Sequence, residues 1–300
     1  GRKIVDYPAV KTDWWLIVGP VLLISLGLLM LRSIAPGQLL SQAVFTAVAI
    51  LVFCLFALTD YQLFFSLHLP AYVLSLALML LPFLFGLASR GAHRWLQFGQ
   101  VFFQPSEVAK PFMIITFAVL ASSQIKHKLA WLTAAFVLPA TLIWFQPDLG
   151  TMLVLAVGWL TVFLPQISRK VLGVVVLLIL VMSPLIWLLL RDYQKDRLIT
   201  WVDPYTDPLG RGYQVIQSTI AVGSGQFWGK GLGQGTQSQL QFLPERQTDF
   251  MFATLAEELG FVGAATVIAL FSWLFVRIYY LARQTSNLAA NFFCLGVLAM

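Results

Sequence analysis

Apolar stretches long enough to cross a lipid bilayer recur along most of this chain, and they constrain its fold more than any other feature. A hydrocarbon core roughly 30 Å thick needs about 20 consecutive apolar residues in a helix. Backbone groups inside lipid must satisfy their own hydrogen bonds, and the stretches lack the two-residue alternation of a membrane barrel, so we predict helices. The predicted spans cover residues 14–31, 38–58, 63–88, 106–123, 129–145, 149–165, 170–190 and 250–281. A ninth starts near Asn287 and reaches Met300 before it is long enough to span.

Composition favours the same class, an all-α, polytopic membrane helix bundle. Of the 300 residues, 59% are hydrophobic and 11% are charged, which leaves too little polar material to cover a soluble core of this size. The net charge of +6 therefore indicates basic loops and contact with anionic lipid, and not nucleic-acid binding. The two cysteines, Cys54 and Cys294, lie in apolar stretches and predict neither a disulfide framework nor a metal motif.

The first apolar stretch follows a basic start and has the length of a membrane span, with no clear cleavage site after it. We therefore expect a first membrane helix and not a signal peptide. Because the chain begins with Gly1 and not with Met, we also expect further residues upstream of it.

Basic residues in the short loops predict the orientation. With a cytoplasmic N-terminus, the inside segments hold nine basic residues and the short outside loops hold three, which agrees with the positive-inside rule. The inside residues are Arg2, Lys3, Lys11, Lys126, Lys128, Arg169, Lys170, Arg277 and Arg283, and the outside residues are Arg32, Arg90 and Arg94. This topology places the long polar segment 191–248 outside the membrane.

Segment 191–248 is the one long part of the chain that is not apolar. Loops of such length are uncommon and are usually functional. Glycine-rich turns between residues 223 and 235 alternate with short amphipathic pieces such as 213–220. We expect a lid or re-entrant element within a single transmembrane domain covering residues 1–300.

Charged residues within or beside the spans are the candidates for chemistry, because a charge at mid-bilayer costs about 2.5–3.5 kcal/mol and persists where it pairs or lines a wet cavity. Glu107 and Lys110 are three residues apart on one helix face and can form an ion pair. One interpretation is a structural tether between helices. The other is that Lys110 meets a phosphate while Glu107 holds a metal ion or orients Lys110.

Three other acids have simpler explanations. Asp148 follows Pro147 at the start of an apolar run, where capping of a helix N-terminus accounts for it. Glu257 and Glu258 lie roughly 12–13 Å along the helix from Asp249, at 1.5 Å per residue. For that pair, pairing or packing is favoured over contact with substrate.

Asp249 lies at the N-terminal end of the eighth predicted helix, directly after the glycine-rich segment. Helix capping is one interpretation. Under the predicted topology, however, Asp249 lies at the same membrane level as Arg94, Trp95, Glu107 and Lys110. Acids and bases that converge beside an apolar interior suit an amphiphile with an anionic head group and a lipid tail, with phosphate bound by Lys and Arg and sugar by Trp95.

Four sequence motifs resemble those of the SEDS family, the bacterial proteins of shape, elongation, division and sporulation. They are RGAHRWLQFGQVFFQPSEVAK (residues 90–110), QPDLGT (146–151), TDPLGRGYQVIQSTIAVGSG (206–225) and GKGLGQGTQSQLQFLPERQTDFMFATLAEELG (229–260). Together they follow the family order over most of the chain. The GTQSQL and LPER wording is more similar to the RodA elongation branch than to the FtsW division branch.

The resemblance implies a peptidoglycan glycosyltransferase that polymerises lipid II during cell elongation and rod-shape maintenance, with a class B penicillin-binding protein as transpeptidase partner. It also implies a multi-pass protein of the bacterial cytoplasmic membrane, with the active site facing outward. Asp249 matches the family's essential aspartate. Positions associated with activity around the cavity match Arg94, Trp95, Gln104, Glu107, Lys110 and Thr236. Gln247 stands where the family often has His. The resemblance also implies a bundle of about ten helices, so we expect its C-terminal part to lie beyond Met300.

The predicted reaction is an inverting sugar transfer with Asp249 as general base, or as a ligand of Mg²⁺ or Mn²⁺ that Glu107 would share. Lys110, Arg94 and Arg246 would stabilise the departing pyrophosphate.

Two alternatives remain at this point. One is a flippase for lipid II, since charge along a cavity is natural in transporters. The other is a non-catalytic scaffold that docks a penicillin-binding protein. Clustering of the charges at one membrane level favours catalysis over both.

Overall fold

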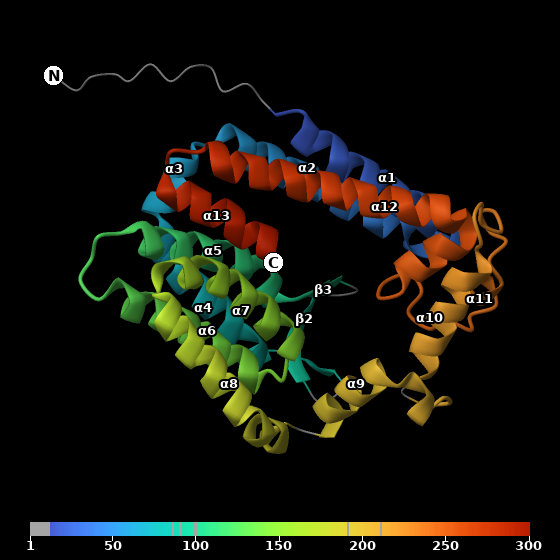
Figure 1. The fold of residues 1–300 in the computed structure, drawn as a ribbon. Helices are drawn as coiled ribbons and strands as arrows, with labels where there is room; N and C mark the ends of the chain where they lie inside the picture. The colour runs from blue at the N-terminus through green and yellow to red at the C-terminus, as the bar shows by residue number, and fades with distance from the viewer. Residues whose placement is uncertain (1–12, 86, 90–91, 99–100, 191, 211) are drawn as a thin grey trace. The chain divides into compact units, whose positions relative to one another are not determined.

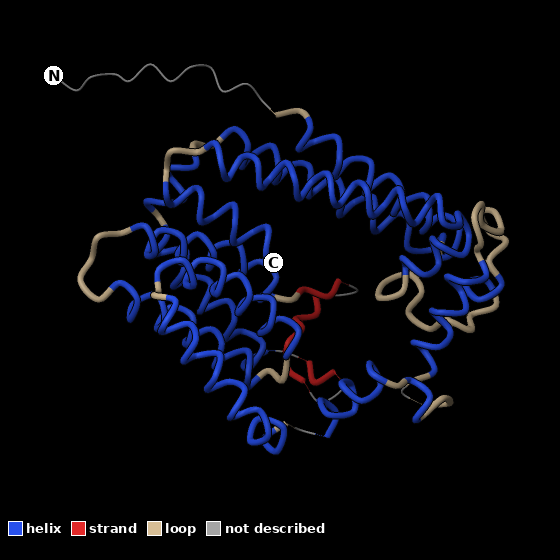
Figure 2. The backbone as a smooth tube through the Cα atoms, in the orientation of Figure 1, coloured by secondary structure: helices blue, strands red, loops and turns tan. Residues whose placement is uncertain are grey.

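The computed structural model describes residues 13–85, 87–89, 92–98, 101–190, 192–210 and 212–300, and these are mostly helical (Figures 1 and 2). The α-helices are α1 (Trp15–Ile34), α2 (Leu39–Leu58), α3 (Tyr61–Ser66), α4 (His68–Phe85), α5 (Pro105–Ser122), α6 (Lys128–Phe145), α7 (Leu149–Phe163), α8 (Arg169–Leu189), α9 (Asp192–Val202), α10 (Tyr213–Ser224), α11 (Thr236–Gln239), α12 (Met251–Gln284) and α13 (Leu288–Ala299). The strands are β1 (Leu87–Ser89), β2 (Ala92–Phe98) and β3 (Val101–Phe103), and short 3₁₀ turns cover Pro36–Gln38, Leu164–Gln166 and Pro204–Thr206.

Each predicted span contains a helix. By length and composition, six of the described helical segments can cross a membrane, namely Trp15–Ile34, Pro36–Leu58, His68–Phe85, Lys128–Phe145, Leu149–Gln166 and Met251–Gln284. The predicted span 63–88 is divided between α3 and α4 on either side of Leu67. The ninth predicted span corresponds to α13, and Asn287 caps it by accepting hydrogen bonds from the N–H groups of Ala289 and Ala290.

The described residues fall into two compact units. Unit 1 consists of the described parts of Gly1–Val52 and Val181–Arg277, and unit 2 consists of those of Phe53–Leu180 and Ile278–Met300. Of the basic residues used for the orientation, Arg2, Lys3, Lys11 and Arg90 lie outside the described residues.

Unit 2 is a bundle around α5. This helix contacts α4, α6, α7 and α13, and it buries a face that includes Ala109, Met113 and Phe117 (Figure 1). Small residues let the neighbours come close, because a Cβ added at Gly296 of α13 would lie 2.7 Å from the Ile114 side chain. Helix α5 therefore forms the core of unit 2, and its first two turns carry the pair Glu107 and Lys110.

A small antiparallel sheet lies between α4 and α5, in the order β1-β2-β3. The all-helical expectation did not include it, since 87–103 was divided between the end of a span and a loop. Strand β2 pairs Trp95 with Leu87 on one side and Phe98 with Val101 on the other. These pairings satisfy the backbone of a segment that is too polar and too short for a further span. The sheet places Arg94 and Trp95 next to the start of α5.

In unit 1, α1 and α12 run antiparallel. Near the start of α1, Trp15 stacks edge-on against Trp273 with ring centroids 5.3 Å apart, and Asp13 forms an ion pair with Arg277. At the other end of α1, the Ser33 hydroxyl donates a hydrogen bond to Glu258 at 2.6 Å. The two helices thus bring the C-terminal end of α1 to the part of α12 that follows the long loop region.

Candidate active site

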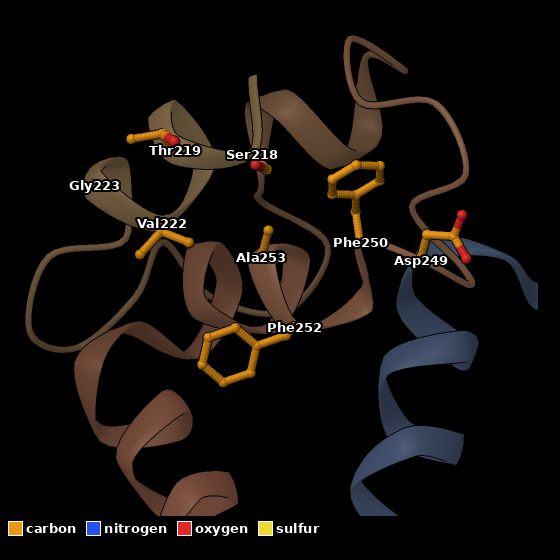
Figure 3. Close-up of a pocket in the computed structure, with 8 residues that line it drawn as sticks. All are labelled: Ser218, Thr219, Val222, Gly223, Asp249, Phe250, Phe252 and Ala253. Atoms are coloured by element: carbon orange, nitrogen blue, oxygen red, sulfur yellow. The ribbon is translucent and has the colours of Figure 1, made fainter. Parts of the chain in front are cut away.

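Asp249 lies two residues before α12, at the edge of a pocket of about 500 Å³ in unit 1. The pocket is lined by Ser218, Thr219, Val222, Gly223, Asp249, Phe250, Phe252 and Ala253 (Figure 3). Its walls come from α10 and from the start of α12, which pack together through the buried residues Ala221, Leu243 and Ala253. In Figure 3 the Asp249 carboxylate lies at one side of this group and points away from Val222 and Ala253.

The carboxylate of Asp249 is exposed, and it accepts no hydrogen bond and forms no ion pair with the described residues of unit 1. The structure therefore does not support the simpler interpretation, in which Asp249 caps helix α12. An acid with no partner among the described residues of its unit, at the edge of a pocket lined by apolar and hydroxyl side chains, can contact the polar head of an amphiphile while the pocket takes its apolar part.

Arg246 has a structural role that the sequence did not indicate. We expected it to stabilise the departing pyrophosphate together with Lys110 and Arg94. Its guanidinium instead donates to the backbone carbonyls of Ser238 and Ile34, the second at 3.2 Å. Arg246 therefore ties the segment before Asp249 to α11 and to the end of α1.

Thr236, which is exposed, belongs to a polar cluster around the buried Glu257. Glu257 has no exposed surface, and its carboxylate accepts a hydrogen bond at 2.9 Å from Lys230, its ion-pair partner. The Thr236 hydroxyl donates to Glu257 at 3.2 Å and accepts from Lys230 at 2.8 Å. Pairing or packing was the expectation for Glu257, and the pairing is confirmed. Lys230 escaped the sequence analysis because its partner is 27 residues away.

Glu258 is also fully buried and also paired within the protein. It accepts hydrogen bonds from the Ser33 hydroxyl at 2.6 Å and from the Gln239 side-chain amide at 3.2 Å. These contacts connect α12 to α1 and to α11. The structure thus gives both glutamates the packing role that was expected of them.

In unit 2, Asp148 contacts three polar residues near the sheet, namely Thr151, Gln104 and Arg94. It caps α7 as predicted, accepting from the Thr151 N–H at 3.3 Å and from its hydroxyl at 3.0 Å. It also accepts from the Gln104 side chain at 2.8 Å and lies 3.5 Å from an Arg94 guanidinium nitrogen. Two predicted substrate-binding residues are therefore held by an acid that the sequence explained by capping alone.

Glu107 and Lys110 form the predicted ion pair, with a distance of 2.8 Å between Lys110 Nζ and the carboxylate. Lys110 is mostly buried, whereas Glu107 is more than half exposed. Trp95, on β2, is partly buried. The convergence of these residues with Asp249 stays a prediction, because they belong to unit 2 and Asp249 belongs to unit 1.

The donor groups fit a weakly held Mg²⁺ or Mn²⁺ better than a cage made of protein ligands. Among the described residues, no group of three or more His, Cys, Asp and Glu side chains is arranged to hold a metal ion. Both carboxylate oxygens of Glu107 are engaged by Lys110, so this residue fits poorly as a ligand. Asp249 alone fits, because Mg²⁺ is commonly held by one or two carboxylates together with water and substrate phosphates.

Comparisons with known proteins support the same family as the sequence motifs. The profile of the FtsW/RodA/SpoVE family, described as a cell cycle protein, matches residues 11–300. The peptidoglycan glycosyltransferase MrdB of Escherichia coli K12 is 44% identical over 223 residues, which are 72% of this chain and 60% of MrdB. A probable peptidoglycan glycosyltransferase FtsW of Alkalilimnicola ehrlichii is 39% identical over 290 residues, or 88% of this chain and 70% of that protein.

Solved structures show the same fold. A chain from a study of the structural coordination of polymerization and crosslinking by a peptidoglycan synthase complex matches with a TM-score of 0.79 and 31% identity, over 97% of this chain and 84% of that one. The rod shape determining protein RodA of Thermus thermophilus matches with a TM-score of 0.68 and 24% identity, over 97% and 82%.

The matched region of this chain spans about 60% of the length of MrdB. The predicted family is confirmed, and the identity to MrdB, a RodA protein, agrees with the predicted branch. Given the family match over residues 11–300 and the membrane-length helices, this chain is a multi-pass membrane protein that belongs to the FtsW/RodA/SpoVE (SEDS) family.

Proposed function

We propose that this protein is a peptidoglycan glycosyltransferase that polymerises lipid II during cell elongation. One observation carries the proposal. Asp249, which matches the family's essential aspartate by resemblance, is an exposed carboxylate without a partner among the described residues of its unit, at the edge of a mostly apolar pocket. The relatives named as peptidoglycan glycosyltransferases support the reaction class.

In the proposed reaction, Asp249 acts as general base. Its carboxylate takes the proton of the 4-hydroxyl of one lipid II sugar, and the hydroxyl oxygen attacks the anomeric carbon of a second lipid II. The bond from that carbon to the pyrophosphate oxygen breaks, and the polyprenyl pyrophosphate leaves with the electron pair. Because a sugar hydroxyl is a poor nucleophile, a positioned base contributes about 10²–10⁴-fold. Inversion at the anomeric carbon requires no covalent glycosyl-enzyme.

Lys110 and Arg94 are proposed to stabilise the departing pyrophosphate. Their counter-charges, Glu107 and Asp148, hold them in defined positions, as electrostatic stabilisation of developing charge requires. A divalent cation at Asp249, when bound, would neutralise part of the same charge. Arg246 is left out of this group, because its guanidinium is occupied by backbone carbonyls of unit 1.

The proposed setting follows from the family and the loops. The site faces outward from the bacterial cytoplasmic membrane, with the N-terminus in the cytoplasm. The proposed partner is a class B penicillin-binding protein that crosslinks the new strands. The similar chain from a peptidoglycan synthase complex, in which polymerization and crosslinking are coordinated, supports this partner.

The first test replaces Asp249 with Asn. Purified full-length protein is incubated with lipid II and Mg²⁺ in detergent, with a chelator in a parallel reaction, and the products are resolved by length. We expect long glycan strands from the unaltered protein and a loss of at least about a hundredfold in Asp249→Asn, since the amide cannot take the proton. Asp192→Asn, an exposed acid of α9, is the matched control and is expected to polymerise normally.

The flippase alternative has one observation in its favour. Helix α12 is interrupted at Gly260, and broken membrane helices are frequent at transporter binding sites. However, the backbone groups freed by this break are bonded to the loop before α11, so they are not available to a transported ligand. Formation of glycan strands by the purified protein would exclude both a pure flippase and a scaffold. The absence of glycan strands, even with the partner present, would contradict the proposed enzyme.

A further inference from the structure

The Glu257 carboxylate accepts hydrogen bonds from several donors that lie in one short part of the chain, residues 230–238. Its Oε1 accepts from Lys230 Nζ and from the Gln237 N–H, both at 2.9 Å, and its Oε2 accepts from the Ser238 N–H at 3.1 Å. The Thr236 hydroxyl adds a fourth hydrogen bond. We call these five residues the Glu257 cluster. A buried carboxylate is tolerated because this donor set compensates for its lost hydration.

The backbone joins the same two segments at the break in α12. In a continuous helix the Phe261 N–H would donate to the Glu257 carbonyl. Here Phe261 donates to Gln226 O at 2.8 Å, and the Glu257 carbonyl accepts from the Lys230 N–H at 3.0 Å. The exchange repeats one residue further on, from Gly231 N to Glu258 O at 2.9 Å and from Val262 N to Phe227 O at 3.3 Å. The first segment of α12, residues 251–259, is thus joined to the glycine-rich loop as well as to the rest of its helix.

Asp249 lies on the stretch of chain that connects α11 to this first segment of α12. The Glu257 carboxylate binds the N–H groups at the start of α11, and Glu257 itself belongs to the segment that follows Asp249. Arg246 adds a second tie from this stretch to Ser238 of α11. Both ends of the stretch that carries Asp249 therefore meet at the Glu257 cluster.

From this geometry we propose that Glu257 is a positioning residue for Asp249, with Lys230 as its counter-ion. The pair keeps the glycine-rich loop and α11 closed against α12, and this closure places the Asp249 carboxylate for proton transfer. The proposal deepens and rests on the proposed function. Misplacement of a catalytic group by about 1 Å can cost about a hundredfold in rate, so loosening the cluster is expected to reduce turnover.

Two variants weaken the cluster in different ways. In Glu257→Gln, one carboxylate oxygen becomes an amide nitrogen, which leaves a backbone N–H of α11 facing another donor and leaves Lys230 without its counter-charge. Lys230→Met keeps the acceptor for α11 and removes only the ammonium, which is partly exposed. Asp192→Asn again serves as the matched control, since it removes a charge from the loop region outside the cluster.

The first readout is the rate of lipid II consumption by monodisperse full-length protein. We expect kcat to fall at least tenfold in Glu257→Gln and about threefold or more in Lys230→Met, with KM within about threefold of the unaltered value. A purely structural role would lower the yield of folded protein while leaving kcat of the folded fraction unchanged. An unchanged kcat in a folded variant would overturn the positioning role.

The second readout does not depend on polymerase activity. Ser238 is fully buried, so a Ser238→Cys thiol, in a background of Cys54→Ser and Cys294→Ser, reacts with a maleimide reagent only when the loop opens. We expect labelling about tenfold faster after Glu257→Gln or Lys230→Met, and an unchanged rate after Asp192→Asn.

The two readouts separate the proposals. If the unaltered protein makes no strands, the proposed function fails, while the labelling rates still decide whether the cluster holds the loop. If Glu257→Gln does not purify as a folded protein, Lys230→Met decides. Equal labelling rates in Lys230→Met and the unaltered protein would contradict the closure of the loop by this pair.

Discussion

Asp148 combines two functions in one side chain. As the N-cap of α7 it accepts hydrogen bonds from the N–H and the hydroxyl of Thr151, and with its remaining capacity it binds Gln104 and Arg94. A carboxylate has two oxygens and about four acceptor positions, so capping leaves room for these partners. The residue therefore connects the sheet, the start of α5 and α7.

Replacing Asp148 with Ala removes the cap and the counter-charge of Arg94 together. We expect it to lower the free energy of unfolding by about 2–3 kcal/mol, against about 1 kcal/mol for Asp60→Ala, which removes only the cap of α3. Thermal unfolding in detergent measures both. Equal losses in the two variants would show that the contacts of Asp148 to Gln104 and Arg94 add nothing to stability.

At the scale of elements, α12 is two helices joined at Gly260. The residue has φ 66° and ψ −163°, a conformation that is essentially restricted to glycine. A Cβ at this position would also lie 2.2 Å from the Gly229 nitrogen and 2.6 Å from the Phe227 carbonyl oxygen. The break and the close approach of the loop therefore depend on the same missing side chain.

Gly260→Ala is accordingly expected to destabilise the protein by at least about 2 kcal/mol, from backbone strain and the clash combined. Gly27→Ala is the matched control, because this glycine lies within α1 of the same unit and a Cβ there meets nothing within 4 Å. That control is expected to be neutral or stabilising by about 0.5–1 kcal/mol. A Gly260→Ala protein as stable as the control would contradict the restriction at residue 260.

At the scale of the whole molecule, membrane-length helices alternate with basic short loops and one long polar segment. The charge bias between the loops predicts a cytoplasmic N-terminus and an external segment 191–248. This orientation decides which side of the membrane Asp249 faces, and therefore whether lipid II on the outer leaflet can reach it.

Cysteine labelling tests the orientation. In a background without Cys54 and Cys294, Leu209→Cys lies on an exposed part of the long segment, and Lys126→Cys lies on the exposed loop between α5 and α6. A membrane-impermeant maleimide added to spheroplasts is expected to label position 209, and to label position 126 only after the membrane is permeabilised. The reverse pattern would contradict the predicted topology and the proposed outward site.

Much of the fold was predictable because membrane spans are a local signal. Apolar stretches of about 20 residues form helices in a membrane, so α1 to α8, α12 and α13 agree with the predicted stretches within a few residues at most ends. Helices α9, α10 and α11 lie in the polar segment 191–248, where no span was predicted. The ion pair of Glu107 with Lys110 and the Asp148 cap were predictable for the same reason, since the partners are three residues apart. The strands β1 to β3 were missed because short strands between spans leave no hydrophobic period to detect.

The sequence by itself determined the membrane class, the helices, the family motifs and Asp249 as the candidate base, because each depends on residues close together in the chain. Only the tertiary structure decided that Arg246 binds backbone carbonyls and that Lys230 pairs with Glu257, because these partners lie far apart in sequence. The same holds for Arg94 and Asp148. Hydrogen bonds and charges act over a few ångströms of space, and spacing along a chain predicts that distance only within one helix or one turn.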